Sequence, residues 1–246
     1  MFVNKGVILA AGDGDRLGSL TTNCPMEVIQ CDFDGTVTRN NLSILLRENF
    51  APGEWRSIDA DYLLGRITVE QSNKLQYALI KEPKEILQEF VRQHIDIRPG
   101  FVEFVSYCRE NDVKLVIVSS GLDFYIETAL AQIGMPDLEL HCGRTDFTDD
   151  GIIVSYTDPE GNAIDGGFKG KYLKWLRGRN IKLVYVGDGL SDLEPACLAD
   201  LVFATGHLAT MLRLESVAWG RFIDFYDLLR LLQANHHLDG SHAATP

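Results

Sequence analysis

The chain has 246 residues, and 23 lysines and arginines against 35 aspartates and glutamates give it a formal net charge of −12. An apolar fraction of 46% with 24% charged residues is typical of a globular protein and excludes a disordered or fibrous one. No run approaches the roughly 18 apolar residues of a membrane span. The acidic balance argues against a nucleic-acid surface, which needs clustered lysine and arginine. The five cysteines are scattered, which predicts reduced thiols in the cytoplasm rather than a zinc site or a disulfide framework.

Short apolar runs that end at glycine, aspartate or serine recur along the chain. They predict buried parallel strands that lead into loops. Helical stretches lie between them, and this alternation is typical of an α/β protein with a doubly wound, Rossmann-like parallel sheet. The strands are expected at 7–11, 28–31, 115–118, 183–186 and 201–204, and helices among them at 101–109 and 125–133.

The segment 41–97 interrupts the alternation. Its amphipathic patterns predict several short helices, separated by Ala51-Pro52-Gly53 and Glu82-Pro83. We therefore expect a small helical cap inserted into a core that comprises residues 26–40 and 98–235. The cap helices are expected at 42–50, 53–63, 69–80 and 84–94.

Two further features are expected outside the cap. The turn Asp149-Asp150-Gly151 precedes an apolar run at 152–156, which predicts a β-hairpin. The last residues, 236–246, are polar and predict a flexible tail.

Reactive side chains follow the ends of the expected strands. In open α/β sheets, ligands bind beyond the carboxyl ends of the strands, so these side chains are expected to meet at one edge. The set comprises Asp32, Asp34, Ser119, Lys169, Asp188 and Asp192.

The chemistry available to such a set is limited. Clustered carboxylates repel one another unless a hard cation lies between them, and Mg²⁺ is the oxygen-binding candidate. A metal ion together with Lys169 would neutralise a phosphoryl group. Asp32 could then attack phosphorus and form an aspartyl-phosphate. Asp34 could protonate the leaving alkoxide and later take a proton from water.

Four segments carry a family resemblance. Asp32-Phe33-Asp34-Gly35-Thr36, Val118-Ser119-Ser120-Gly121, Lys169 and Gly187-Asp188-Gly189-Leu190-Ser191-Asp192 resemble, in order, the four motifs of the haloacid dehalogenase superfamily. The resemblance implies a nucleophile at Asp32 and an acid/base at Asp34. It also implies phosphate ligands at Ser119, Ser120 and Lys169. Mg²⁺ would be held by Asp32, the carbonyl of Asp34 and Asp188, with Asp192 as an additional carboxylate beside them.

The helical insert is similar to the cap of the phosphoserine phosphatase branch. Further segments resemble the 2-hydroxy-3-keto-5-methylthiopentenyl-1-phosphate phosphatases. The resemblance implies a cytoplasmic phosphatase of a small phosphomonoester, with no nucleic-acid or membrane partner, that could form a homodimer. Phosphoserine phosphatase activity is the main alternative, and a phosphomutase or a non-catalytic phosphate-binding module are others. The segments lie at 50–55, 98–101, 120–124 and 198–204.

Two positions bear on the substrate. Phosphoserine phosphatases bind the serine with a glutamate nine residues after the nucleophile and an arginine in the cap. Ungapped counting places Asn41 and Gln76 there, and a slip of one helical turn would bring Lys74 or Arg66 into play. Since a desolvated ammonium and carboxylate need opposite charges, phosphoserine is expected to be a poor substrate and an uncharged sugar-like or diketo phosphate a better one.

Residues 1–25 resemble the start of a sugar-phosphate nucleotidyltransferase. A glycine-rich loop follows the apolar run there, and Arg16 would contact nucleotide phosphates. The lysine expected after Pro25 is replaced by Met26, so we interpret the segment as a fusion remnant, with a fragment of a bifunctional nucleotidyltransferase/phosphatase as an alternative. We expect a chain that begins at Met26 to stay soluble and active. Loss of folding in that truncated chain would contradict the prediction.

Overall fold

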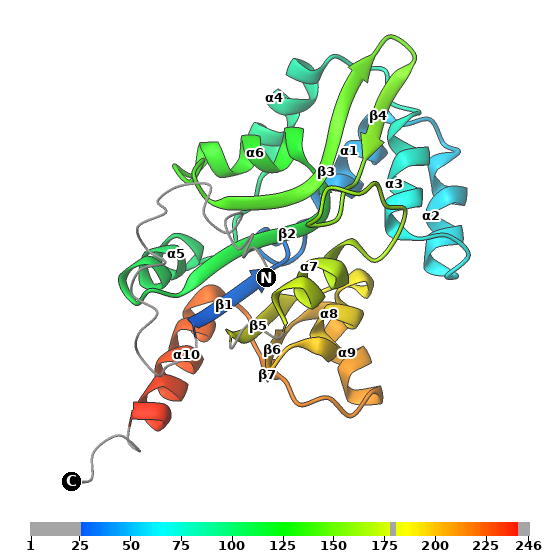
Figure 1. Ribbon diagram of the computed structural model, residues 1–246. Coiled ribbons are helices and arrows are strands. Elements are labelled where there is room, and N and C mark those ends of the chain that lie inside the picture. Colours follow the sequence, from blue (N-terminus) through cyan, green and yellow to red (C-terminus); the bar gives the residue numbers. More distant parts are fainter. Residues whose placement is uncertain (1–25, 178–180, 241–246) are drawn as a thin grey trace, which may run out of the picture.

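The computed structural model describes residues 26–177 and 181–240, and the expected strand at 7–11 lies outside them (Figure 1). Within these ranges a seven-stranded sheet has the order β4-β3-β2-β1-β5-β6-β7. All neighbouring strands are parallel except β3 and β4, which form an antiparallel pair. This topology confirms the predicted α/β fold. The strands are β1 Met26–Cys31, β2 Lys114–Leu122, β3 Glu139–Thr148, β4 Gly151–Ser155, β5 Ile181–Gly187, β6 Leu201–Ala204 and β7 Gly220–Arg221.

Helices cover both faces of the sheet. α5 and α6 pack on one face, with α10 against α5, and α7 and α8 pack on the other (Figure 1). This sandwich buries the apolar strands on both sides, as their sequences predict. The helices are α1 Leu42–Phe50, α2 Trp55–Leu63, α3 Val69–Tyr77, α4 Lys84–His94, α5 Phe101–Glu110, α6 Asp123–Gln132, α7 Phe168–Leu176, α8 Leu193–Leu198, α9 Gly206–Leu214 and α10 Phe225–Gly240, with a 3₁₀ turn, η3, at Leu190–Asp192.

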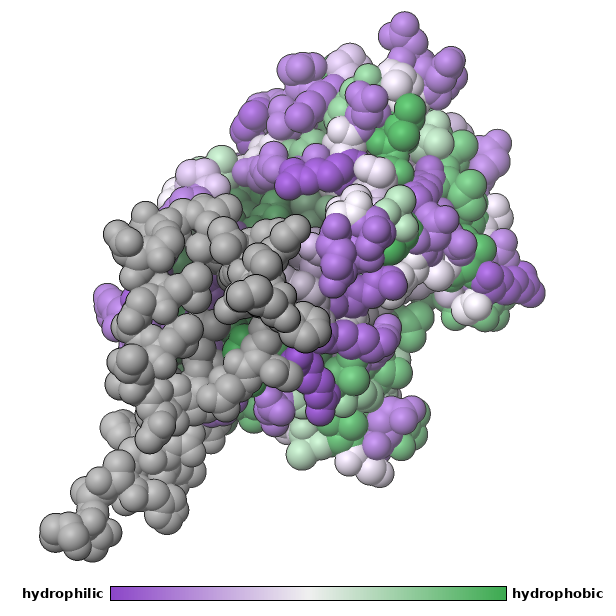
Figure 2. Space-filling model, in the orientation of Figure 1, coloured by the Kyte–Doolittle hydropathy of each residue, from purple (hydrophilic) through white to green (hydrophobic). Residues whose placement is uncertain are grey.

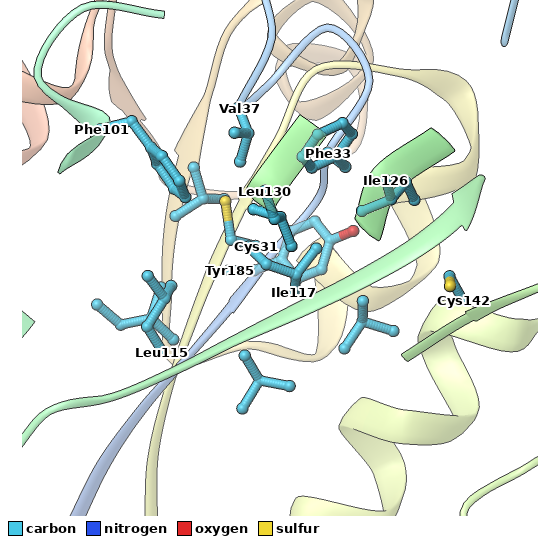
Figure 3. Close-up of a cluster of buried hydrophobic side chains, with 14 of the residues drawn as sticks. Cys31, Phe33, Val37, Phe101, Leu115, Ile117, Ile126, Leu130, Cys142 and Tyr185 are labelled. Carbon is cyan, nitrogen blue, oxygen red and sulfur yellow. The ribbon is translucent and has the colours of Figure 1, made fainter. Parts of the chain in front are cut away.

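The core lies between the sheet and its helices. Figure 3 shows part of it, with Cys31 from β1, Ile117 from β2, Tyr185 from β5, and Ile126 and Leu130 from α6. In β2 every residue after Lys114 is buried. The strand continues four residues beyond the predicted end, and its pairing with β3 shifts register between Val118 and Leu122.

The helices α1, α2 and α3 lie beyond the carboxyl end of β1, where the sheet edge would bind a ligand (Figure 1). Asn41 caps α1 by accepting a hydrogen bond from the backbone of Ile44 at 2.9 Å. Thr68 and Gln71 form a capping box at the start of α3. α4 has the predicted bounds and packs on α6. The division of the chain into core and cap stays a prediction.

The hairpin expected around 152–156 is present, because β4 pairs with β3 across the turn at Asp149 and Asp150. It packs against α3. Gly151 has φ +137°, and a Cβ atom there would lie 2.1 Å from the carbonyl oxygen of Ala78. Glycine therefore allows the hairpin to approach the C-terminal end of α3.

The C-terminal helix α10 extends beyond its expected end. It continues to Gly240, so residues 236–240, which the sequence predicts as part of a flexible tail, are helical. No helix in the described ranges is long and apolar enough to cross a membrane. On the face in Figure 2, hydrophilic residues cover much of the described surface, and hydrophobic ones are interspersed among them.

Candidate active site

The predicted side chains meet at the carboxyl edge of the sheet. Asp32 follows β1, Asp188 follows β5, and Asp192 ends η3. Lys169 lies in the first turn of α7, and its ammonium nitrogen is 2.7 Å from Asp32 Oδ1 and 2.6 Å from Asp192 Oδ1. The lysine is only 3% exposed, so this ion-pair cluster is shielded from bulk water.

The charge state of Lys169 follows from its neighbours. Burial alone would lower the pKa of this ammonium, but Asp192 and Asp32 outweigh burial and raise the pKa above its usual value. The lysine therefore stays protonated. It offers a fixed positive charge to any anion that enters the site.

Three carboxylates form a group with the chemistry of a metal site. Oxygen atoms of Asp32, Asp188 and Asp192 all lie within 4.8 Å of one another. Burial, and next the charge of Asp192, raise the pKa of Asp32 well above its usual value and that of Asp188 to about 7. Three carboxylates with one lysine leave a net negative charge, which a hard divalent cation would offset. The residues present fit such an ion.

Gly35 makes room beside this group. Its φ is +80°, and a Cβ atom at this position would lie 2.3 Å from Asp188 Oδ2. Thr36 holds the other oxygen of Asp188 through a 2.9 Å hydrogen bond. The glycine and threonine that follow Asp34 therefore position a carboxylate from another strand.

Asp192 is already saturated with hydrogen bonds. Its Oδ1 accepts from Lys169 and from Tyr185 at 2.6 Å, and its Oδ2 accepts from the backbone of Asp188 at 3.0 Å and Gly189 at 2.8 Å. With four donors engaged, it is better suited to hold Lys169 and the loop after β5 than to bind a metal directly. Tyr185 was not predicted from the sequence as a site residue.

Asp34 is held by two donors from different elements. The backbone of Leu42 donates to Oδ1 at 2.7 Å, and the Tyr125 hydroxyl donates to Oδ2 at 2.5 Å. Burial raises the pKa of Asp34, although both hydrogen bonds oppose the shift. A raised pKa suits a carboxyl group that must give up a proton and later recover it.

Tyr125 lies outside the set of site residues that the sequence predicts. It is fully buried, yet its hydroxyl contacts a predicted catalytic group. Gly121 permits this contact, because a Cβ atom there would lie 2.1 Å from the tyrosine oxygen. No pattern in the sequence predicts the hydrogen bond between Tyr125 and Asp34. It joins the first turn of α6, which starts at Asp123, to the loop that follows β1.

The two serines at the end of β2 have different surroundings. Ser119 Oγ accepts a hydrogen bond from the backbone of Gly121 at 3.0 Å. The carbonyl oxygen of Ser120 accepts from Asn73 at 2.7 Å and from Tyr156 at 2.6 Å, but its hydroxyl is buried without a partner. Asn73 thus ties α3 to this strand end.

A cavity of about 200 Å³ opens between the helices α2 and α3 on one side and β2, α7 and η3 on the other. Tyr62 and Glu70 line it from the first side, and Ser120, Lys169 and Ser191 line it from the second. Burial raises the pKa of Tyr62 to about 12, so its hydroxyl is a neutral hydrogen-bonding group. The cavity gives the cluster a binding space of small-molecule size.

The two substrate positions inferred from the sequence have other roles. Asn41 caps α1, and the buried Gln76 accepts a hydrogen bond from the guanidinium of Arg47. A guanidinium from α1 therefore lies beside Gln76, and the role of positions 41 and 76 in substrate binding stays a prediction. The alternative cations point elsewhere, since Lys74 pairs with Asp165 and Arg66 pairs with Asp61.

Comparison with known proteins identifies relatives across most of the chain. Residues 29–196 match a family model described as haloacid dehalogenase-like hydrolase. A 2-hydroxy-3-keto-5-methylthiopentenyl-1-phosphate phosphatase of Brevibacillus brevis is 32% identical over 214 residues, which cover 84% of this chain and 95% of that protein. One of the same name from Geobacillus kaustophilus is 31% identical over 210 residues and covers 84% and 95%.

The fold also resembles a solved structure. A phospho-aspartyl intermediate analogue of phosphoserine phosphatase superposes with a TM-score of 0.62 at 21% sequence identity. The superposition covers 84% of this chain and 99% of that one. At this identity the likeness shows the fold alone.

Proposed function

Because the chain belongs to the haloacid dehalogenase-like hydrolase family, we propose that it is a Mg²⁺-dependent phosphatase of 2-hydroxy-3-keto-5-methylthiopentenyl-1-phosphate or a related sugar-like phosphate. The proposal rests on one observation: the side chains of Asp32, Lys169 and Asp188 lie close together at one edge of the sheet. Relatives of that printed name, matched over nearly their whole length, support the substrate class.

The reaction we propose has two steps. A carboxylate oxygen of Asp32 attacks phosphorus, the ester P–O bond breaks, and Asp34 gives its proton to the departing oxygen. An aspartyl-phosphate remains on Asp32. Asp34, now a carboxylate, takes a proton from water as the water oxygen attacks phosphorus and releases Asp32 and inorganic phosphate.

Other residues bind the phosphoryl group. Lys169 supplies a fixed positive charge, and Ser119 and Ser120 supply hydroxyl groups at the end of β2. Asp32, Asp188 and the carbonyl oxygen of Asp34 would hold Mg²⁺, and Asp192 would hold Lys169 in place. When bound, the ion supplies positive charge that offsets the phosphoryl oxygens and the carboxylates.

Phosphate release by the purified protein tests the function. Supplied with Mg²⁺ and 2-hydroxy-3-keto-5-methylthiopentenyl-1-phosphate, the protein should release inorganic phosphate, and EDTA should stop the release. Phosphoserine in parallel serves as the second candidate, favoured only by the fold likeness. A higher kcat/KM for phosphoserine than for the phosphate ester with the uncharged diketo leaving group would overturn the assignment.

The affinity for Mg²⁺ is expected to depend on pH. Asp188 has a pKa of about 7 in the metal-free site, so below that pH the ion must displace a proton. The affinity should therefore fall as the pH drops below 7. Isothermal titration calorimetry at several pH values measures this, and an affinity that is constant between pH 5.5 and 7 would contradict it.

Two broader expectations accompany this function. We place the enzyme in the cytoplasm, in line with the free thiols that the described ranges show at Cys31, Cys108, Cys142 and Cys197, and we retain the homodimer as an expectation. Fractionation and light scattering of the full chain test these two expectations.

A further inference from the structure

Asp34 has a hydrogen-bond donor on each of its two carboxyl oxygens. The backbone of Leu42, at the start of α1, donates to Oδ1 at 2.7 Å, and the hydroxyl of Tyr125, in the first turn of α6, donates to Oδ2 at 2.5 Å. The torsion that turns an aspartate carboxyl group about its Cβ–Cγ bond is soft, so a single hydrogen bond leaves the group free to pivot. Bonds to both oxygens fix its plane.

The hydroxyl of Tyr125 is itself held in place by packing. The side chain is fully buried, and its ring packs edge-on against that of Phe124, with the centroids 5.4 Å apart. The space that the hydroxyl oxygen occupies exists because position 121 is glycine, since a Cβ atom there would lie 2.1 Å from that oxygen. The donor on Oδ2 is therefore a rigid part of the core.

Asp34 must deliver its proton to one particular atom. In the proposed first step the proton goes to the ester oxygen as the P–O bond breaks, and this transfer needs the carboxyl group within hydrogen-bond reach of that oxygen. Asp34 is partly exposed whereas Tyr125 is buried, so the tyrosine holds the carboxyl group from the protein side and leaves it accessible to a substrate. Each carboxyl oxygen has two acceptor positions, so Oδ2 can accept from Tyr125 and still carry the proton.

We propose that Tyr125 is a positioning residue, which acts through Asp34 by fixing the plane of its carboxyl group for proton delivery to the departing oxygen. This inference rests on the proposed phosphatase function and assigns a further residue to it. It implies that Tyr125 matters most for esters whose leaving group needs a proton. An alcohol leaves as a strongly basic alkoxide unless it is protonated, whereas a carboxylate leaves without a proton.

The competing explanation is structural. The hydrogen bond between Tyr125 and Asp34 joins α6 to the loop after β1, so it would serve only to hold these two elements together. The loss of the hydroxyl would then impair the hydrolysis of every phosphate compound by the same factor. Dependence of the loss on the leaving group therefore separates the two explanations.

Steady-state kinetics of Tyr125→Phe on ethyl phosphate and acetyl phosphate make the test. The two compounds are similar in size, but the first releases an alcohol and the second releases acetate. We expect kcat/KM to fall by about 10²-fold for ethyl phosphate and by less than about threefold for acetyl phosphate, after correction for its spontaneous hydrolysis. Equal losses on both compounds, or no loss on either, would overturn the proposal.

Tyr77→Phe is the matched control. It removes a hydroxyl that is equally buried but is hydrogen-bonded to Ser43, at 2.9 Å. The ratio of the two kcat/KM values should stay within about twofold of the wild-type ratio, in line with a substitution that does not touch the acid/base. A change in this ratio as large as that of Tyr125→Phe would contradict a specific role for Tyr125.

Unfolded protein does not affect the result, because both compounds are measured on the same preparation and its inactive fraction cancels in the ratio. If Tyr125→Phe does not fold, Gly121→Ala decides by the same criterion. Its added methyl group would displace the hydroxyl from Asp34 while the tyrosine remains. It should therefore impair ethyl phosphate selectively, and equal losses on both compounds would overturn the proposal.

Failure of the proposed function gives a different result from failure of this inference. If wild-type protein hydrolyses neither compound nor the pentenyl phosphate, the phosphatase function and the role of Tyr125 are both wrong. If it hydrolyses ethyl and acetyl phosphate but Tyr125→Phe loses equally on both, only the role of Tyr125 is wrong. If Tyr125→Phe loses selectively on ethyl phosphate while the pentenyl phosphate is not hydrolysed, the inference is supported and only the substrate name is wrong.

Discussion

Asp32→Asn is expected to abolish turnover and leave the fold intact. The amide cannot act as the nucleophile, and the barrier should rise by several kcal/mol, with each 1.36 kcal/mol worth tenfold in rate. We expect a loss of at least about 10³-fold in kcat. Asp34→Asn should be nearly as severe, because it removes the acid/base.

The same substitution should not destabilise the protein. Asp32, Asp188 and Asp192 face one lysine, so removal of one negative charge relieves repulsion while Asp192 still pairs with Lys169. The midpoint of thermal unfolding of the metal-free protein should stay equal to that of wild type or rise. Asp150→Asn, in the exposed hairpin turn, is the matched control for both measurements. If Asp32→Asn kept more than a few per cent of the wild-type rate, the aspartyl-phosphate mechanism would be wrong.

Local sequence patterns were sufficient to predict the fold class. The strands that became β1, β5 and β6 are apolar runs that stop at aspartate, glycine or threonine, and β6 has the predicted bounds. Burial on both faces makes such runs nearly continuous in hydrophobicity, so they are easily recognised. The predicted strand is shorter than β2 because Ser119, Ser120 and Gly121 interrupt the apolar run, although all three are buried in the strand.

The approach of the reactive side chains was predictable for a related reason. Parallel strands place their carboxyl ends at one edge, and residues that directly follow them, such as Asp32 and Asp188, must lie there. Local pattern alone therefore predicted which residues meet, and the structure adds the hydrogen bonds that orient them.

Contacts between distant elements were not predictable. Tyr125 reaches Asp34 and Arg47 reaches Gln76 through the packing of helices that no local pattern describes. Counting along the chain places the predicted substrate residues at Asn41 and Gln76, but it does not show that a guanidinium from another helix lies beside Gln76. A tyrosine or arginine in an amphipathic helix carries no sign of its partner.

Replacement of Lys169 by methionine should both destabilise the protein and inactivate it. The side chain is buried between Asp32 and Asp192, and no other cation forms an ion pair with either carboxylate in the described structure. Removing one partner of a buried ion pair typically costs about 3–5 kcal/mol, because the remaining charge is uncompensated. We expect a fall of that size in the free energy of unfolding at neutral pH, measured with urea on metal-free protein.

The pH dependence identifies the cause of that loss. Without Lys169, the pKa of Asp32 rises further above its unfolded value, because the main neighbour that lowers it is gone. A carboxyl group whose pKa is higher in the folded state binds more protons there, so stability falls as the pH rises toward that pKa. The deficit of Lys169→Met should therefore be larger at pH 8 than at pH 5.

Lys171→Met makes the same change at an exposed position two residues along α7 and should leave stability within about 0.5 kcal/mol of wild type. A deficit that is equal at both pH values would show that lost packing, rather than uncompensated carboxylates, destabilises the variant.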